Sequence, residues 1–389
     1  MANEIIQSIR KLEKWVSDKN YKGHDPYDGL NSKILNYIKI NNKYFKIAWI
    51  QTLKHSPVNL RPLLFVPTGC NPKGMGLFLA SNVAIYKKTS NLENLKKCKM
   101  LAEWLTDHSE KKFTGSCWGY NFDWQSRTFF IPKNTPTIVN TAFIGHAFLD
   151  LFNVTKEKRN LEIAVSACKF IEHDLNIQKI KSGEICFSYT PIDKSKIHNA
   201  NLLGASLLSR VSQYQNSKVW KNLIEDSTNF SLSKQHENGS WYYGEDKNQH
   251  WIDSYHTGFN LIALRYINNF LENERVKKSI EFGEIFYSRN FFTKDGKPKF
   301  LNNSLYPIDV HCPSTALKYF SEIPKYQILA EKIYLWFTKN MQKNDGSFIF
   351  QINKFYKNKT SYMRWGQAWA LYGLSSYLLF HSKNGKNSL

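Results

Sequence analysis

The feature that most constrains this chain is a unit that recurs five times. Each copy is an apolar, helix-like segment centred on an alanine, and the central alanines stand 53 to 58 residues apart at Ala147, Ala205, Ala263, Ala316 and Ala370. A turn with glycine and an aromatic residue precedes each copy, starting at Gly115, Gly183, Gly239, Gly296 and Gly346. A period of this length is typical of stacked supersecondary units, so the fold must be built from repeats.

A second, amphipathic helix is predicted ahead of each of the last four glycine turns. The charged residues of these helices fall on one face, as expected for helices that lie at a surface. The predicted ranges are 156–174, 218–234, 274–287 and 325–340. One unit is therefore a helical hairpin with a long loop. A single hairpin cannot bury its apolar face, so neighbouring hairpins must stack.

Apolar periodicity predicts further helices over 4–17, 30–54, 75–86 and 92–108. When the helix at 75–86 is partnered by an N-terminal helix, the chain has six hairpins. Six hairpins leave no open end if they close into an (α/α)6 toroid, in which inner helices surround a central funnel. We expect an all-α, single-domain chain over 1–389, with N-terminal helices in 1–72, hairpin repeats in 73–380 and a polar tail in 381–389. An open superhelical array of the same hairpins is the alternative.

Composition limits the class of protein. A chain of 389 residues with 42% hydrophobic content can bury a large core, so it is folded and globular. No apolar stretch approaches the roughly 18 residues of a membrane span, and the start of the chain lacks the apolar run of a signal peptide. The six cysteines are scattered, without the spacing of a zinc site. We expect a soluble, cytoplasmic protein with no cofactor and no bound metal.

The formal net charge of +21 indicates a polyanionic partner. The chain is also rich in Lys, Asn and Ile together, so the charge has a purely compositional explanation as well. The basic residues are spread out, and no pattern of a nucleic-acid-binding module is present, so nucleic acid is not the expected partner. An acidic oligosaccharide or polysaccharide, or an anionic membrane surface, fits the charge better.

Two of the turns carry a resemblance to known proteins. Gln235-His-Glu-Asn-Gly239-Ser-Trp241 and Gln342-Lys-Asn-Asp-Gly346-Ser-Phe348 are similar to the Q-x-x-x-G-x-W element of α/α-toroid proteins, which include the six-hairpin glycosidase and terpenoid cyclase superfamilies. The stretch 239–263 resembles poorly characterised proteins from bacterial capsule and O-antigen gene clusters. The resemblance implies a toroid over about 110–380 and a part in surface-polysaccharide biosynthesis. The acidic motifs of terpenoid cyclases, D-x-D-D and D-D-x-x-D, are absent from the sequence.

The candidate site is the mouth of the funnel, where loops enter the inner helices. The positions seven residues before the central alanines begin these helices, and Ile-Asp pairs recur just upstream. The predicted catalytic residues are Asp253, Tyr255, His256, Asp309 and His311. The predicted substrate-binding residues are Asn140, His198, Asn201, Trp241, Tyr243, Glu245, Arg364 and Trp365.

Several chemistries remain open for these residues. Glycoside hydrolysis needs two carboxylates, which Asp253 with Asp309 or Glu245 would supply. Lyase or epimerase chemistry on a uronic acid needs a base, an acid and a group that neutralises the carboxylate. The residues that match that inventory are His256, Tyr255, His311, Arg364 and Asn140. A metal site built from His198, His256, His311 and Asp309 is a further alternative, although its ligands come from different hairpins.

The structural alternative is that Asp253 and Asp309 simply cap helices, each cap contributing about 1 kcal/mol. Our expectation is an enzyme that modifies or cleaves a bacterial surface polysaccharide or its precursor in the funnel. The contrasting hypothesis is a non-catalytic glycan-binding or scaffolding module for membrane-associated glycosyltransferases.

Overall fold

The computed structural model describes residues 2–38, 41–126 and 129–381. Over these residues the chain is predominantly helical, with fourteen α-helices and seven short β-strands, which confirms the predicted all-α class. The expected polar tail, 381–389, lies outside the described residues except for His381.

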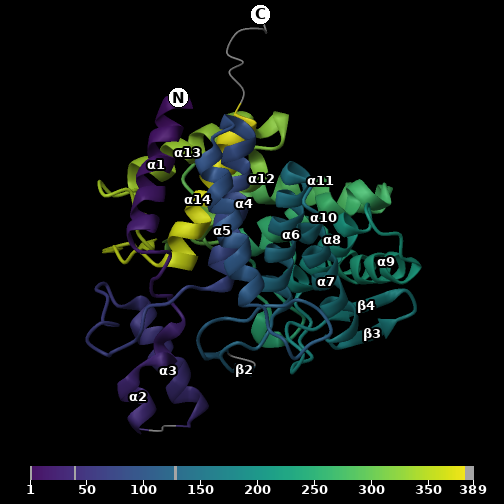
Figure 1. Ribbon diagram of the computed structural model, residues 1–389, viewed down its shortest axis with the longest axis horizontal. Coiled ribbons are helices and arrows are strands. Elements are labelled where there is room, and N and C mark those ends of the chain that lie inside the picture. The colour runs from purple at the N-terminus through teal and green to yellow at the C-terminus, as the bar shows by residue number, and fades with distance from the viewer. Residues whose placement is uncertain (1, 39–40, 127–128, 382–389) are drawn as a thin grey trace, which may run out of the picture.

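Six helices form an inner ring. They are α4 (Pro72–Thr89), α6 (Ile138–Thr155), α8 (His198–Val211), α10 (Ser254–Leu271), α12 (His311–Phe320) and α14 (Trp369–Phe380). Each packs on the next, and α14 packs on α4 (Figure 1). The ring is therefore closed, as predicted for the toroid and in contrast to the open array.

Six further helices surround this ring. They are α1 (Ala2–Asp18), α5 (Leu92–Asp107), α7 (Lys158–His173), α9 (Lys218–Ser233), α11 (Glu274–Asn290) and α13 (Gln327–Met341). The helices from α5 to α13 pack on the inner helices from α4 to α12, and α1 packs on α14. The sequence explains the two layers. Helix α6 is buried all round over residues 138–149, whereas α9 buries only one face.

The Q-x-x-x-G turns link successive outer helices. Gln235 Nε2 donates hydrogen bonds to the carbonyl of Gly239 in its own turn and to the carbonyl of Ser279 in α11. Gln342 makes the same link from the turn after α13 to the carbonyl of Ser8 in α1. The N-terminal helix thus takes the place of the sixth outer helix, and the motif is explained by the architecture.

The predicted helix at 30–54 is wrong as one element. It is divided into a 3-10 turn at Asp28–Asn31, α2 (Lys33–Ile38) and α3 (Lys43–His55). The side chains of Ser32 and Asn42 accept backbone N–H groups three residues later, so each starts a new helix. In Figure 1 these short helices form a separate layer beside the ring.

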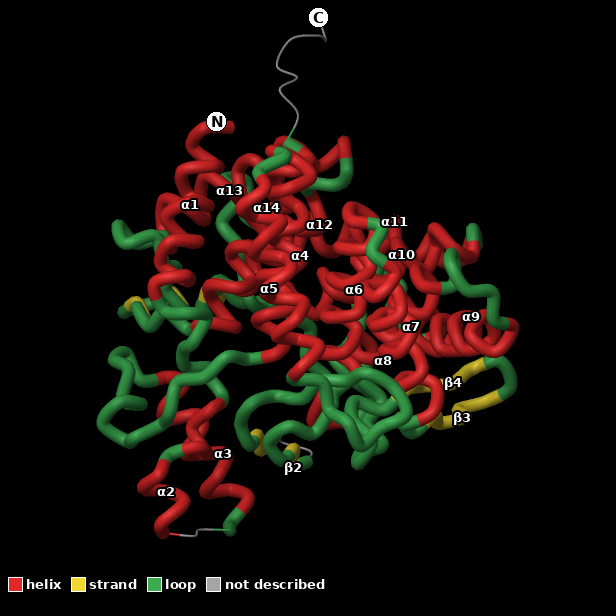
Figure 2. Tube along the Cα trace, viewed as in Figure 1, coloured by secondary structure: helices red, strands yellow, loops and turns green. Residues whose placement is uncertain are grey.

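The long loops gather on the side of the molecule where the inner helices begin (Figure 2). Short antiparallel strands stiffen them: β1 (Trp124–Gln125) with β2 (Phe130–Ile131), β3 (Ile177–Lys181) with β4 (Glu184–Phe187), and β6 (Gln351–Ile352) between β5 (Ile308–Asp309) and β7 (Lys357–Asn358). This side is the mouth of the funnel.

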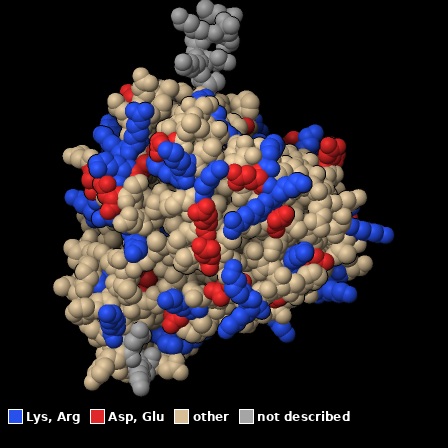
Figure 3. All heavy atoms as spheres, viewed as in Figure 1, with Lys and Arg blue, Asp and Glu red and all other residues tan. Residues whose placement is uncertain are grey.

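Basic side chains are spread over the face shown in Figure 3, with acidic side chains among them. The charge on this face is therefore not concentrated in one patch. Of the helices in the described part of the chain, none has both the length and the apolar character needed to cross a membrane.

Candidate active site

A cavity of about 460 Å³ opens at the mouth of the funnel. All six inner helices, or the turns that lead into them, contribute to its wall with Lys73, Val139, Asn199, His256, His311 and Arg364. Helix α3 covers another side with Ile47, Gln51, Lys54 and His55. The volume and the mixed aromatic and polar lining are typical of a small-molecule site.

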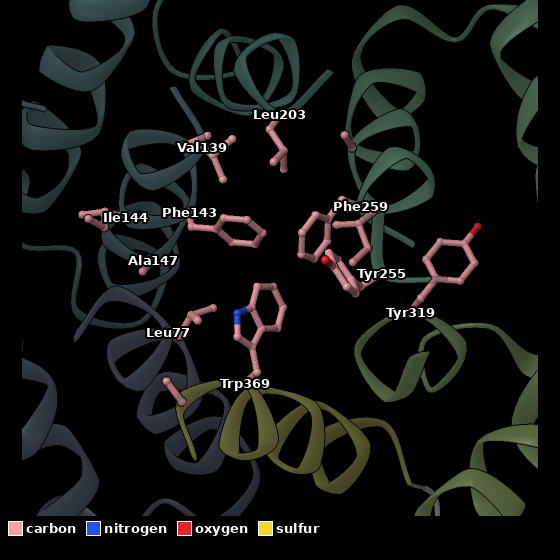
Figure 4. Close-up of a cluster of buried hydrophobic side chains, with 14 of the residues drawn as sticks. Leu77, Val139, Phe143, Ile144, Ala147, Leu203, Tyr255, Phe259, Tyr319 and Trp369 are labelled. Atoms are coloured by element: carbon pink, nitrogen blue, oxygen red, sulfur yellow. The ribbon is translucent and has the colours of Figure 1, made fainter. Parts of the chain in front are cut away.

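Three aromatic rings fill the centre of the ring below this cavity. Phe143, Phe259 and Trp369 come from three different inner helices and converge in Figure 4. Their ring centroids lie 5.0 to 5.4 Å apart. Of these rings Phe259 also lines the cavity, so a ligand that enters from the mouth would meet an aromatic face there.

Asp253 and His256 form a hydrogen-bonded pair at the start of α10. Asp253 Oδ1 accepts the backbone N–H of His256 at 3.0 Å, so Asp253 is an N-cap. Its Oδ2 accepts the indole N–H of Trp251 at 2.9 Å and bonds His256 Nδ1 at 2.6 Å. A carboxylate on Nδ1 places the hydrogen there and leaves Nε2 as a basic nitrogen. The His256 side chain is 19% exposed and lines the cavity.

His311 lines the same cavity and is almost completely buried. Within the described part of the chain, neither of its ring nitrogens has a hydrogen-bond partner. Burial, followed by the charges of Lys73 and Arg364, lowers the pKa of His311 well below its usual value. The ring is therefore neutral, with one donor and one acceptor that no described residue satisfies.

Tyr255 contacts both imidazoles. Its ring centroid is 4.4 Å from that of His256 and 4.6 Å from that of His311. Burial raises the pKa of Tyr255 well above its usual value, so its hydroxyl keeps its proton. One wall of the cavity thus carries two imidazoles and a phenol.

Asp309 does not line the cavity. Its Oδ1 accepts the indole N–H of Trp365 at 2.9 Å and the backbone N–H of His311 at 2.9 Å, and its Oδ2 accepts from Gln351 at 2.7 Å. Burial raises its pKa. With both oxygens engaged inside the protein, Asp309 holds the start of α12 and positions the Trp365 ring.

Three basic side chains reach the cavity wall. Arg364 belongs to a π-helical segment, Met363–Ala368, and such segments are often found at functional sites. Its guanidinium binds the buried carboxylate of Asp25 through Nε at 2.6 Å and Nη2 at 2.7 Å. Lys54 Nζ lies 2.9 Å from the hydroxyl of Tyr27. The third basic side chain is Lys73.

Some of the predicted residues meet at the cavity and others do not. Those that line it are Tyr243, Tyr255, His256, His311, Arg364 and Trp365. Those that lie outside its lining are Asn140, His198, Asn201, Trp241, Glu245, Asp253 and Asp309. Most of the second group make internal contacts: His198 Nε2 pairs with Glu245 at 3.0 Å, and the Trp241 indole donates to the carbonyl of Ser231.

The four proposed metal ligands are not brought together, because His198 is paired with Glu245 and Asp309 is enclosed by its own partners. No group of three His, Cys, Asp or Glu side chains suited to a metal ion occurs within the described ranges.

Sequence reasoning missed Lys73, Lys54, Asn199 and Asp25. A signal for Lys73 was present, because it stands seven residues before Ala80, as His256 stands seven residues before Ala263. Lys54 and Asp25 lie in the N-terminal segment outside the hairpin repeats, so the repeat spacing gives no signal for them.

No family model and no curated protein matches this sequence. Solved structures do match. A glycosyl hydrolase family 88 protein from Bacteroides vulgatus superimposes with a TM-score of 0.63 at 10% identity, covering 98% of this chain and 100% of that one. The fold is the (α/α)6 toroid.

Two enzymes of other kinds share it. Cellobiose 2-epimerase from Bacillus thermoamylovorans has a TM-score of 0.61 at 13% identity and covers 80% of this chain and 87% of its own. A GH76 α-mannanase from Bacteroides thetaiotaomicron has a TM-score of 0.60 at 10% identity and covers 79% and 86%. At such identities the likeness establishes the fold, and the chemistry has to be argued from the site.

Proposed function

We propose that the protein is a carbohydrate-active enzyme that removes a proton from a sugar carbon next to a carbonyl or carboxylate group, with His256 as the base. The observation that carries the proposal is the Asp253–His256 pair, whose imidazole lines the cavity. A carboxylate on Nδ1 orients the ring and stabilises the imidazolium formed when Nε2 takes a proton. His311 and Tyr255 lie on the same wall and supply hydrogen bonds to the sugar.

Proton transfer fits the cavity better than hydrolysis by two carboxylates. Retaining and inverting glycosidases both place a carboxyl group on each side of the scissile bond. None of the described residues that line the cavity is Asp or Glu. Asp253 and Asp309 lie behind the wall with their oxygens already bonded. The enolate formed by His256 would either be reprotonated, giving an epimer or isomer, or eliminate a neighbouring substituent, giving an unsaturated sugar.

The lining supports an acidic sugar as substrate. Lys54 and Arg364 bring cationic groups to the wall, and the carboxylate that binds Arg364, Asp25, does not itself line the cavity. Aromatic side chains, among them Tyr243 and Trp365, provide flat surfaces for a sugar ring. The same similarity in fold to an epimerase and to glycoside hydrolases supports a saccharide ligand.

The biological setting in the proposal is bacterial capsule or O-antigen synthesis in the cytoplasm, at the membrane face where glycosyltransferases work. It is supported by the resemblance of residues 239–263 and by the net charge of +21, which favours an anionic surface. Its test is glycan analysis of a strain that lacks the protein; an unchanged surface polysaccharide would contradict it.

The chemistry is tested in deuterium oxide with acidic oligosaccharides and acidic monosaccharides. The expected result is deuterium at a single carbon, detected by NMR and mass spectrometry, together with an epimer, an isomer or an unsaturated product. His256→Ala should abolish the exchange while sugar binding, measured by calorimetry, persists. Sugar that binds without exchange or product formation would instead support the glycan-binding module.

A further inference from the structure

Lys73 is an unusual residue in the cavity wall. It lies in the first turn of α4 and is 3% exposed. Its Nζ lies over three aromatic rings, 4.7 Å from the centroid of Phe143, 5.3 Å from that of Trp369 and 5.5 Å from that of Phe259. These are the rings that converge in Figure 4. Its ammonium group makes no hydrogen bond or ion pair with any residue that the structure describes.

This environment does not suit a permanent ammonium ion. An ammonium has three N–H donors, and aromatic faces satisfy them only in part. Burial, followed by the charge of Arg364, lowers the pKa of Lys73 well below its usual value, and Asp25 opposes this only partly. A desolvated lysine beside another cation is the usual form of a nucleophilic amine, because its neutral state is populated near neutral pH.

We propose that Lys73 forms an imine with the carbonyl carbon of a reducing sugar bound in the cavity. This inference rests on the proposed function and deepens it by naming the form of the substrate. Lys73 lines the same cavity as His256, so the carbon next to the imine would lie within the space that the base faces.

The chemistry balances without a further reagent. The neutral amine adds to the aldehyde or ketone of the open-chain sugar, and the resulting carbinolamine takes up a proton and loses water to give a protonated imine. His256 Nε2 removes the proton from the adjacent carbon, whose electrons move towards the nitrogen and form an enamine. Reprotonation of that carbon and addition of water release the new sugar and the free amine.

The aromatic rings favour this intermediate. A protonated imine is a cation, so the faces of Phe143, Phe259 and Trp369 stabilise it as they would an ammonium. It has one N–H instead of three, so fewer donors are left without an acceptor. The surroundings of Lys73 thus match a protonated imine better than the resting ammonium.

The inference separates two substrate classes. A sugar with a free reducing end opens to a carbonyl and can form the imine, whereas an internal uronic acid residue of a polymer has only a carboxylate and cannot. The imine at Lys73 therefore favours epimerisation of a small reducing sugar over elimination within a polysaccharide.

The test uses the full chain with D-glucuronic acid and sodium cyanoborohydride, which reduces imines, and locates the label by peptide mass spectrometry. We expect one sugar on Lys73, formed on the order of tenfold or more faster than on exposed lysines, because the lowered pKa of Lys73 leaves more of its amine unprotonated. Methyl glucuronide, which has no free carbonyl, should give no label. Lys318 is the internal control, because it is also buried but is paired with Glu322 and should stay unlabelled.

Label spread over exposed lysines without preference for Lys73 would overturn the inference. Lys73→Arg keeps a long basic side chain but cannot form the imine, and it should lose the deuterium exchange. If that variant exchanges deuterium at the wild-type rate, the imine is wrong and proton transfer by His256 stands. If Lys73 is labelled in a protein that never exchanges deuterium, the imine stands and the proposed function is wrong. Labelling of the wild-type protein shows whether Lys73 forms the imine even if the variant fails to fold.

Discussion

Asp253 serves its helix and the cavity with different atoms. Oδ1 caps α10, while Oδ2 binds the His256 ring and the Trp251 indole. In the neighbouring repeat, Asp309 also accepts a backbone N–H at a helix start, but its remaining contacts go to Gln351 and Trp365 and not to an imidazole ring. The two aspartates at helix starts therefore have different chemical roles, which depend on the hydrogen-bond partners of the second carboxylate oxygen.

Asp253→Asn should slow deuterium exchange by roughly 10- to 100-fold, the usual effect of losing the partner that orients a functional histidine. The amide oxygen can still cap α10, but the amide nitrogen cannot accept from His256 Nδ1. Asp309→Asn is the matched control. It should lose about as much thermal stability as Asp253→Asn but less of the deuterium-exchange rate. Thermal unfolding and exchange rates measured on both variants check this, and equal losses of exchange would contradict the distinction.

Glu245, which lies outside the cavity lining, makes the stability of the fold depend on pH. The hydrogen bond from His198 lowers the pKa of Glu245 to about 2, against the ordinary value of 4.5. The lowered pKa means that the ionised carboxylate stabilises the folded state relative to the unfolded state. This stabilisation is complete above the ordinary pKa and is lost as the pH falls towards about 2. Urea unfolding of wild type and Glu245→Gln should differ more at about pH 6 than at about pH 3. A difference that is independent of pH would show that the contact contributes nothing.

At the scale of elements, the glycine turns decide how hairpins meet. Gly239 has φ of +88° and lies against the backbone of α11, where an added Cβ would come within 2.3 Å of the carbonyl oxygen of Phe282. Gly183 has φ of +70° in the corresponding turn, but the nearest atom to its Cβ position is 3.9 Å away. The two glycines share a backbone conformation and differ in their surroundings.

Alanine substitutions at Gly183 and Gly239 separate the cost of the backbone conformation from the cost of the close contact. Gly183→Ala should cost roughly 1–2 kcal/mol of unfolding free energy, the expected penalty for a left-handed alanine. Gly239→Ala should cost about 1–3 kcal/mol more, because α11 must move away from the new methyl group. Denaturant midpoints of the two variants check this, and similar losses would mean that the α9 and α11 hairpins shift freely.

The repeats could be predicted because their signals are local. The glycine turns precede helices whose central alanines recur every 53 to 58 residues, two of these turns carry the Q-x-x-x-G element, and a period of this length leaves few architectures. The position of α3 and Asp25 at the cavity could not be predicted, since both come from a segment outside the repeats and reach the site only through tertiary packing. Carboxylates near the mouth were also visible in the sequence, but whether Asp309 faces the cavity or the protein interior depends on its hydrogen-bond partners.

At the scale of the whole molecule, closure of the ring means that the turn after α13 is linked to α1 in the same way as the turn after α9 is linked to α11. Gln342 links the α13 turn to Ser8 of α1, as Gln235 links the α9 turn to α11. In a ring with no free end, removing one such link destabilises all the hairpins. In an open array, a hairpin at the end unfolds alone.

Gln342→Ala and Gln235→Ala should therefore lower the unfolding free energy by similar amounts, about 1–3 kcal/mol each, because both leave buried carbonyl groups without a donor. Amide hydrogen exchange should accelerate in α8, on the far part of the ring, as well as in α1 when Gln342 is replaced. Faster exchange that is confined to α1 would show that the ring behaves as an open array.

The contact between α14 and α4 also sets an order of events during synthesis. Helix α4 begins at Pro72 and its partner α14 at Trp369, so at about 5–20 residues per second the ribosome delivers the second helix some tens of seconds after the first. Until then the face of α4 that α14 will cover stays exposed, and Arg364 and Trp365 are missing from the cavity wall. A nascent chain that stops short of Arg364 and Trp365 therefore has no complete cavity, and binding activity can arise only once these residues and α14 have been made.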